Sequence, residues 1–192
     1  PQPIKAESGG EGLLSGYASV YWVVDSYGEC TAPGCFSQSV ADRGPDGKNR
    51  IPFRYEHEHT IGTHTKMDAD DTKGLQIEAA IVDDGMYGTV LRRHLAAGVP
   101  YGISIGFRAL RGRPATPEDP LIWDYAPPWM RETPDPGMVW VLESTKLMEN
   151  SGVTFPAVEP ATIDSYKHDA TQQLERLMLS AKAGTLTPTQ VG

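Results

Sequence analysis

A strict alternation of apolar and polar residues between positions 73 and 82 is the feature that most limits the folds open to this chain. The apolar positions of the alternation are Leu75, Ile77, Ala79 and Ile81, and Gln76 and Glu78 fall between them. A period of two places the apolar side chains on one face of an extended segment and the polar ones on the other. The pattern therefore predicts a half-buried β-strand.

Other parts of the chain are also predicted as strands. They are residues 13–24, which are rich in aromatic and β-branched side chains, residues 51–57, the segment around Ser104, and residues 137–142 and 146–154. Strands outnumber helices, and the two do not alternate regularly. We therefore expect a mainly β (α+β) fold, an antiparallel β-barrel ringed by a few helices.

Three segments are predicted to be helical. Residues 36–42 form a short helical turn, and a second helix follows the capping residues Asp83 and Asp84 and ends before Gly98. Residues 162–183 are predicted as a third helix, followed by a disordered tail. The domain organisation we expect is one domain over residues 1–161 and a C-terminal helix with a flexible tail over residues 162–192.

A proline-rich segment separates the Ser104 strand from the strands that follow it. Residues 111–136 contain seven prolines, together with Trp123, Tyr125 and Trp129. A strand within a sheet does not tolerate this density of proline, because proline cannot donate a ladder hydrogen bond. We expect an irregular insertion loop on the surface.

Charge and composition exclude some classes of function. The net charge of −8 argues against nucleic-acid binding, which depends on clustered lysine and arginine. No apolar run approaches the length of a membrane-spanning helix. The two cysteines, Cys30 and Cys35, lack a second pair with which to form a zinc site, and we expect them to be reduced thiols.

Ser104 lies in a Gly-Ile-Ser-Ile-Gly segment, residues 102–106. The segment matches the G-x-S-x-G nucleophile elbow of α/β-hydrolases, but that elbow requires a helix directly after the serine, and none is predicted here. By itself the segment is more typical of a tightly packed strand whose glycines allow close backbone approach. Ser104 could act as a nucleophile only if a general base lies close to it.

The histidines His57, His59 and His64 lie close together in the sequence. In a strand, His57 and His59 would point the same way, and three interpretations are open. The residues could form an exposed polar face, they could supply a general base with an orienting partner, or they could bind a metal with His64 or a glutamate as third ligand.

Four segments, in order, resemble the prohead (capsid maturation) protease family of tailed bacteriophages. They are Ser15-Gly16-Tyr17-Ala18-Ser19-Val20 with the turn at residues 24–28 and Pro33-Gly34-Cys35-Phe36; Phe53-Arg54-Tyr55-Glu56-His57 with Ile61-Gly62 and Lys73-Gly74-Leu75; Gly98 with Gly102-Ile103-Ser104-Ile105-Gly106-Phe107; and Leu147-Met148-Glu149-Asn150-Ser151 with Thr154-Phe155-Pro156-Ala157. Together they cover residues 13–161. The ordered set is more specific than any single segment.

The resemblance implies a serine endopeptidase with a fold like that of herpesvirus assemblin. It implies His57 as general base, Ser104 as nucleophile and Glu149 as the carboxylate that orients the imidazole, with His59 as the alternative third member. It implies no cofactor and no metal. Residues 1–161 would then be the protease domain.

The family resemblance also implies partners and a location. The substrates would be the major capsid protein and a scaffold segment, cut inside the assembling procapsid in the host cytoplasm, with self-cleavage and a homodimer or higher homo-oligomer. Neither nucleic acid nor membrane is an expected partner. Asn150 and Gly152 stand where the family usually has apolar residues, which motivates the alternative of a catalytically inactive relative that serves as a capsid assembly or scaffold component.

Overall fold

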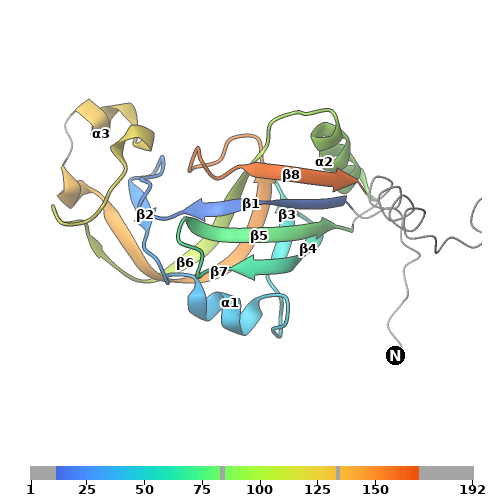
Figure 1. The fold of residues 1–192 in the computed structure, drawn as a ribbon, viewed down its shortest axis with the longest axis horizontal. Helices are drawn as coiled ribbons and strands as arrows, with labels where there is room; N and C mark the ends of the chain where they lie inside the picture. The colour runs from blue at the N-terminus through green and yellow to red at the C-terminus, as the bar shows by residue number, and fades with distance from the viewer. Residues whose placement is uncertain (1–11, 83–84, 133–134, 169–192) are drawn as a thin grey trace, which may run out of the picture.

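The computed structural model describes residues 12–82, 85–132 and 135–168, and strands dominate this part of the chain (Figure 1). The strands are β1 (Gly12–Val20), β2 (Glu29–Thr31), β3 (Pro52–Tyr55), β4 (His59–Asp68), β5 (Gly74–Ile81), β6 (Gly102–Pro114), β7 (Trp140–Val153) and β8 (Ile163–His168). The helices are α1 (Ser37–Arg43), α2 (Met86–Ala96) and α3 (Pro128–Glu132), with 3₁₀ turns η1 (Trp123–Tyr125) and η2 (Pro136–Met138). Within the described ranges, no helix is both long enough and apolar enough to cross a lipid bilayer.

All eight described strands belong to a single sheet. Its order is β2-β7-β3-β4-β5-β1-β8, and β6 pairs with β7 outside this path. The pairs are antiparallel except for β7 with β2 and β7 with β3, which are parallel. The sheet curls into a half-barrel, and an isolated bridge between Gly102 and Thr162 connects the start of β6 to the chain just before β8. The predicted mainly β fold is confirmed.

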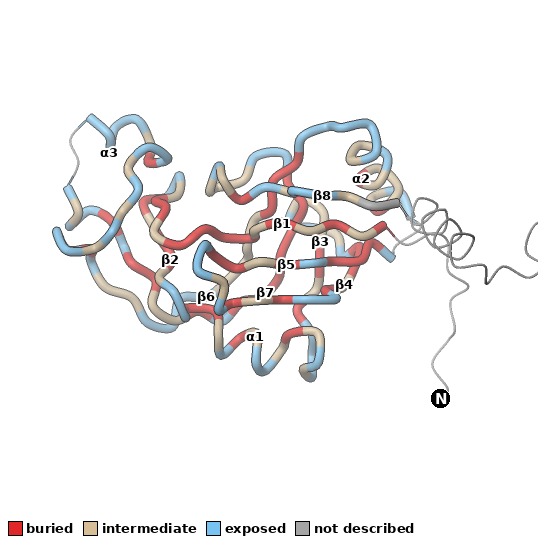
Figure 2. The backbone as a smooth tube through the Cα atoms, in the orientation of Figure 1, coloured by how far each residue is buried: buried red, intermediate tan, exposed pale blue. Residues whose placement is uncertain are grey.

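The alternating residues between positions 73 and 82 form a half-buried strand, as predicted. In β5, Leu75, Ile77 and Ile81 are fully buried, whereas Glu78 is exposed. The buried faces of β5 and of its neighbours β1 and β4 enclose the main core (Figure 2). Burial of about ten large apolar side chains of this kind supplies most of the stability of a domain of this size.

Helices α1 and α2 cover the sheet at different places. The hydroxyl of Ser39 in α1 donates to the carbonyl of Thr145 and accepts from the amide of Leu147, which joins α1 to β7. Leu91 in α2 is fully buried in the main core. Both helices were predicted from the sequence, although the capping residues Asp83 and Asp84 lie outside the described residues.

The proline-rich segment is less irregular than we expected. Its first four residues continue β6 as far as Pro114, and its later described residues include η1, α3 and the start of η2. The excursion packs into a second, smaller core that it shares with neighbouring parts of the chain, made by Val24, Cys30, Ala115, Ala126, Met130, Val139 and Val141. Pro114 ends the pairing of β6 with β7, and Pro128 and Pro136 begin α3 and η2. At such positions a missing amide hydrogen costs least.

The prediction of a helix over residues 162–183 is wrong for its first part. Ile163–His168 form β8, which pairs antiparallel with β1 through partners such as Tyr166 and Leu14. The three-residue spacing of Ile163 and Tyr166 suits a helix, but the open edge of β1 offers unpaired backbone groups that β8 satisfies. The remainder of the predicted helix lies outside the described residues, and the division of the chain at residue 161 stays a prediction.

Candidate active site

His57 lies in the tight turn between β3 and β4. Its φ is 61° and that of Glu56 is 48°, both in the left-handed region that non-glycine residues rarely adopt. The amide of Glu56 donates to the carbonyl of Gly152 on β7 at 3.0 Å. The prediction of a strand through residue 57 is therefore wrong at its end, because a contact with a distant strand holds the backbone in an otherwise unfavourable conformation.

Glu149 on β7 is the partner of the His57 ring. Its Oε1 lies 2.7 Å from Nδ1 of His57, and the glutamate is only 6 % exposed. The side chain of His57 is 46 % exposed, so its far edge remains open to solvent. A buried carboxylate is costly unless it is paired, and this pairing also fixes the orientation of the imidazole.

The register between β6 and β7 places Ser104 beside this pair. Ser104 is opposite Ser151, and Gly106 is opposite Glu149. Residues directly opposite in an antiparallel ladder project from the same face of the sheet. Ser104 and Glu149 therefore belong to the face that His57 approaches.

Gly106 leaves the space that the Glu149 carboxylate occupies. A Cβ atom at position 106 would lie 2.2 Å from Oε1 of Glu149. From the sequence, the glycines around Ser104 indicated close backbone approach, whereas at Gly106 the space is taken by a carboxylate from the neighbouring strand. Gly106 and Ser151 are the two site residues that the sequence interpretation did not assign.

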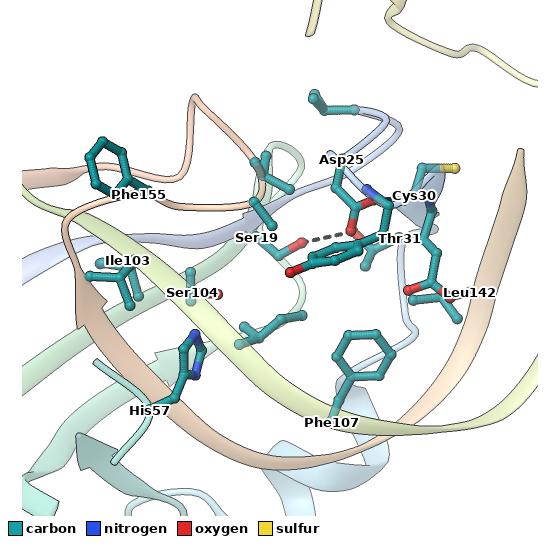
Figure 3. Close-up of a pocket in the computed structure, with 18 of the residues that line it drawn as sticks. Ser19, Asp25, Cys30, Thr31, His57, Ile103, Ser104, Phe107, Leu142 and Phe155 are labelled. Carbon is teal, nitrogen blue, oxygen red and sulfur yellow. Dashed lines mark hydrogen bonds between the residues drawn. The ribbon is translucent and has the colours of Figure 1, made fainter. Parts of the chain in front are cut away.

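His57 and Ser104 both line a single cavity of about 310 Å³. Figure 3 draws the two side chains on the same wall, with Phe155 and Ile103 on one side and Phe107 on the other. The pocket extends from them toward Asp25, in the turn before β2, and Glu29, the first residue of β2. A base, a hydroxyl and a cavity that admits a ligand to both are thus brought together.

The far end of the cavity is acidic. Burial raises the pKa of Asp25, and burial together with the nearby Asp25 raises the pKa of Glu29. Two backbone amides, those of Tyr27 and Glu29, donate to Oδ1 of Asp25 at 2.8 and 2.9 Å. Of the described residues that line the cavity, none is lysine or arginine.

Comparison with known proteins identifies a family for this chain. A family model described as caudovirus prohead serine protease matches residues 2–175. The chain belongs to the caudovirus prohead serine protease family. It is also similar to a protein named Prohead protease from Enterobacteria phage HK97, with 28 % identity over 102 residues, which is 52 % of this chain and 43 % of the relative. The match thus spans less than half of that relative's length, and no solved structure matches the chain.

The two residues that replace apolar residues of the family pattern, Asn150 and Gly152, project away from the Glu149 carboxylate. Asn150 is fully buried and follows Glu149 directly in β7, so its side chain projects from the opposite face of the sheet. Among the described residues, neither polar atom of its side chain has a hydrogen-bond partner. Gly152 accepts the hydrogen bond from Glu56 through its carbonyl. The local strand and the His57–Glu149 contact are formed despite both departures.

His59, the alternative third member, has partners other than His57 among the described residues. Its ring stacks on Tyr87 of α2, with centroids 3.6 Å apart, and its Nε2 is 3.5 Å from Oε2 of Glu58. Because His57 lies in a turn, the premise that His57 and His59 share one strand is wrong. His64 is buried, and its Nδ1 lies 3.0 Å from the carbonyl oxygen of Ile51.

The described residues of this chain contain no group of side chains placed to bind a metal ion. Across residues 12–82, 85–132 and 135–168, no three histidine, cysteine or acidic side chains are placed to hold a metal ion. Cys30 and Cys35 are buried and unpaired with each other. Burial raises the pKa of the Cys30 thiol to about 12, so it is not a nucleophile at neutral pH although it lines the cavity.

We expect His64 to make the protein sensitive to acid. Burial lowers the pKa of His64 to about 4 from 6.5, so below 6.5 the unfolded chain binds a proton that the folded protein excludes. The free energy of unfolding should therefore fall as the pH drops from 6.5 toward 4, by about 3 kcal/mol from this residue. Urea unfolding of the wild type and of His64→Gln at pH 7 and pH 4.5 measures the difference. An equal pH dependence in both proteins would contradict this assignment.

Proposed function

We propose that this protein is a serine endopeptidase that uses Ser104 as nucleophile, His57 as general base and Glu149 as the orienting carboxylate. The observation that carries the proposal is the 2.7 Å contact between Nδ1 of His57 and Oε1 of Glu149. This contact leaves Nε2 of the ring available in the cavity that Ser104 lines. A serine, a histidine and a carboxylate in this relation form the catalytic arrangement of serine hydrolases on many unrelated folds.

The reaction would proceed through an acyl-enzyme. Nε2 of His57 takes the proton from Oγ of Ser104 while Oγ forms a bond to the scissile carbonyl carbon, and the carbonyl electron pair moves onto its oxygen. Collapse of this intermediate breaks the C–N bond, and the imidazolium returns the proton to the leaving amine. Water then repeats the sequence and releases the acid. Glu149 holds the ring in place and stabilises the imidazolium in both halves.

The substrates we propose are the major capsid protein precursor and a scaffold segment, cut during head maturation inside the assembling procapsid in the host cytoplasm. The family name and the name of the HK97 relative support this choice. Self-cleavage and a homodimeric or larger assembly belong to the same proposal. The cavity is large enough to receive a side chain and its flanking backbone, as a peptide substrate requires.

Labelling with an alkyl fluorophosphonate tests the proposed nucleophile. We expect one adduct per chain at Ser104, located by peptide mass spectrometry. Ser151 is an internal comparison, because it lies opposite Ser104 in the ladder yet is fully buried and should remain unmodified. Labelling should be lost in Ser104→Ala and strongly slowed in His57→Ala. A wild-type protein that stays unlabelled, or is labelled elsewhere, would favour the inactive assembly component instead.

A further inference from the structure

Ser151 makes two hydrogen bonds that join both parts of the His57–Glu149 pair. Its hydroxyl oxygen accepts from the backbone amide of His57 at 3.1 Å, and its hydroxyl proton is donated to Oε2 of Glu149 at 2.5 Å. Ser151 is fully buried. One small side chain is thus bonded to the main chain that carries the base and to the carboxylate that orients it.

Each of these bonds restrains a group that would otherwise be free to move. The backbone at His57 has a φ of 61°, and a side-chain acceptor on its amide favours this conformation over a relaxed one. The two oxygens of Glu149 have different partners, Nδ1 of His57 for Oε1 and Ser151 for Oε2. A carboxylate held at both oxygens cannot rotate away from the imidazole.

We propose that Ser151 is a positioning residue for the reaction. It orients the His57 ring toward Ser104, through Glu149 and through the backbone of the turn. The inference rests on the function proposed above. Ser151 does not touch substrate and is not a second nucleophile, because its hydroxyl is buried and already donates to a carboxylate. Loss of its hydroxyl should therefore slow the reaction through geometry.

Ser39 provides a matched control. It is also a buried serine, and its hydroxyl also accepts from a backbone amide, that of Leu147 at 2.9 Å, and donates to an oxygen, the carbonyl of Thr145 at 2.8 Å. It lies on α1 and does not line the cavity. Ser39→Ala and Ser151→Ala thus remove the same kind of bonds, and only the second removal affects the candidate site.

The rate of labelling by the alkyl fluorophosphonate measures this effect without a known substrate. We expect Ser151→Ala to label Ser104 about 10- to 100-fold more slowly than the wild type, the range that a misplaced catalytic group produces. Ser39→Ala should label within about threefold of the wild-type rate. If the wild type labels at Ser104 and the two alanine variants do not differ, the inference about Ser151 is wrong and the proposed function stands.

A double-variant comparison separates positioning from general destabilisation. In a Glu149→Gln background, Ser151→Ala should slow labelling by less than about threefold, because residues that act as one unit are not additive. Effects that multiply fully would show that Ser151 does not act through Glu149, against that part of the inference. Thermal unfolding reports whether each variant is folded. If Ser151→Ala does not fold, Ser151→Cys, with a weaker donor in similar space, takes its place in the same comparisons.

Discussion

Replacing Ser104 with alanine is expected to abolish cleavage of a co-expressed capsid protein precursor. The alanine removes the hydroxyl that would form the acyl-enzyme, and loss of a serine nucleophile typically lowers kcat by about 10⁶-fold. Ser104 is only partly buried on β6, and it pairs with Ser151 through the backbone ladder, which the substitution leaves intact. The fold should therefore survive. Mass spectrometry of the products from the wild type and the variant measures the outcome.

A serine in another strand serves as the control for this experiment. Ser15 on β1 pairs with Ser165 of β8, where the two hydroxyls lie 2.8 Å apart, and it does not line the cavity. Ser15→Ala should leave the product pattern unchanged. Continued cleavage by a pure Ser104→Ala protein would exclude the proposed nucleophile, and with it the proposed mechanism.

Glu149→Gln is expected to lower the rate of peptide hydrolysis by about 10²- to 10⁴-fold while the protein remains folded. The amide has nearly the same shape, but it lacks the charge that stabilises the imidazolium, and its NH₂ group can face Nδ1 and force the wrong ring tautomer. The buried position of Glu149 removes water that could replace the carboxylate. Initial rates on the capsid precursor, followed by gel or mass spectrometry, measure the loss.

Two variants make the Glu149 experiment specific. Glu143 lies on the same strand and pairs with Arg111 and Arg113 at 3.0 and 3.1 Å, so Glu143→Gln removes a charge from β7 without touching the His57 ring. His59→Gln tests the alternative third member. A rate that falls with His59→Gln and is retained with Glu149→Gln would transfer the orienting role to His59.

Periodicity and residue type were sufficient to predict the secondary structure of segments whose conformation depends mainly on their own sequence. The alternation of Leu75, Ile77 and Ile81 with polar residues predicted β5, because a half-buried strand needs that pattern whatever its neighbours are. The order of the family-like segments predicted that His57 and Ser104 belong together. The structure places both on one cavity, and it adds the carboxylate contact on Nδ1 of His57.

Long-range contacts between strands and turns determined the features that were predicted incorrectly from the sequence. Ile163 and Tyr166 suit a helix by spacing, yet they pair with β1 as part of β8. His57 leaves the extended conformation because Gly152 and Ser151, almost a hundred residues later, bind the backbone of its turn.

The sequence by itself determined the mainly β character of this protein, its helices α1 and α2 and the family to which its motifs point, because these follow from local preference and residue identity. Only the tertiary structure decided that Gly106 must be a glycine beside Glu149 and that Ser151 bonds both the His57 turn and the carboxylate. The register between β6 and β7 creates those neighbours. Register depends on how distant strands pack, which no local pattern specifies.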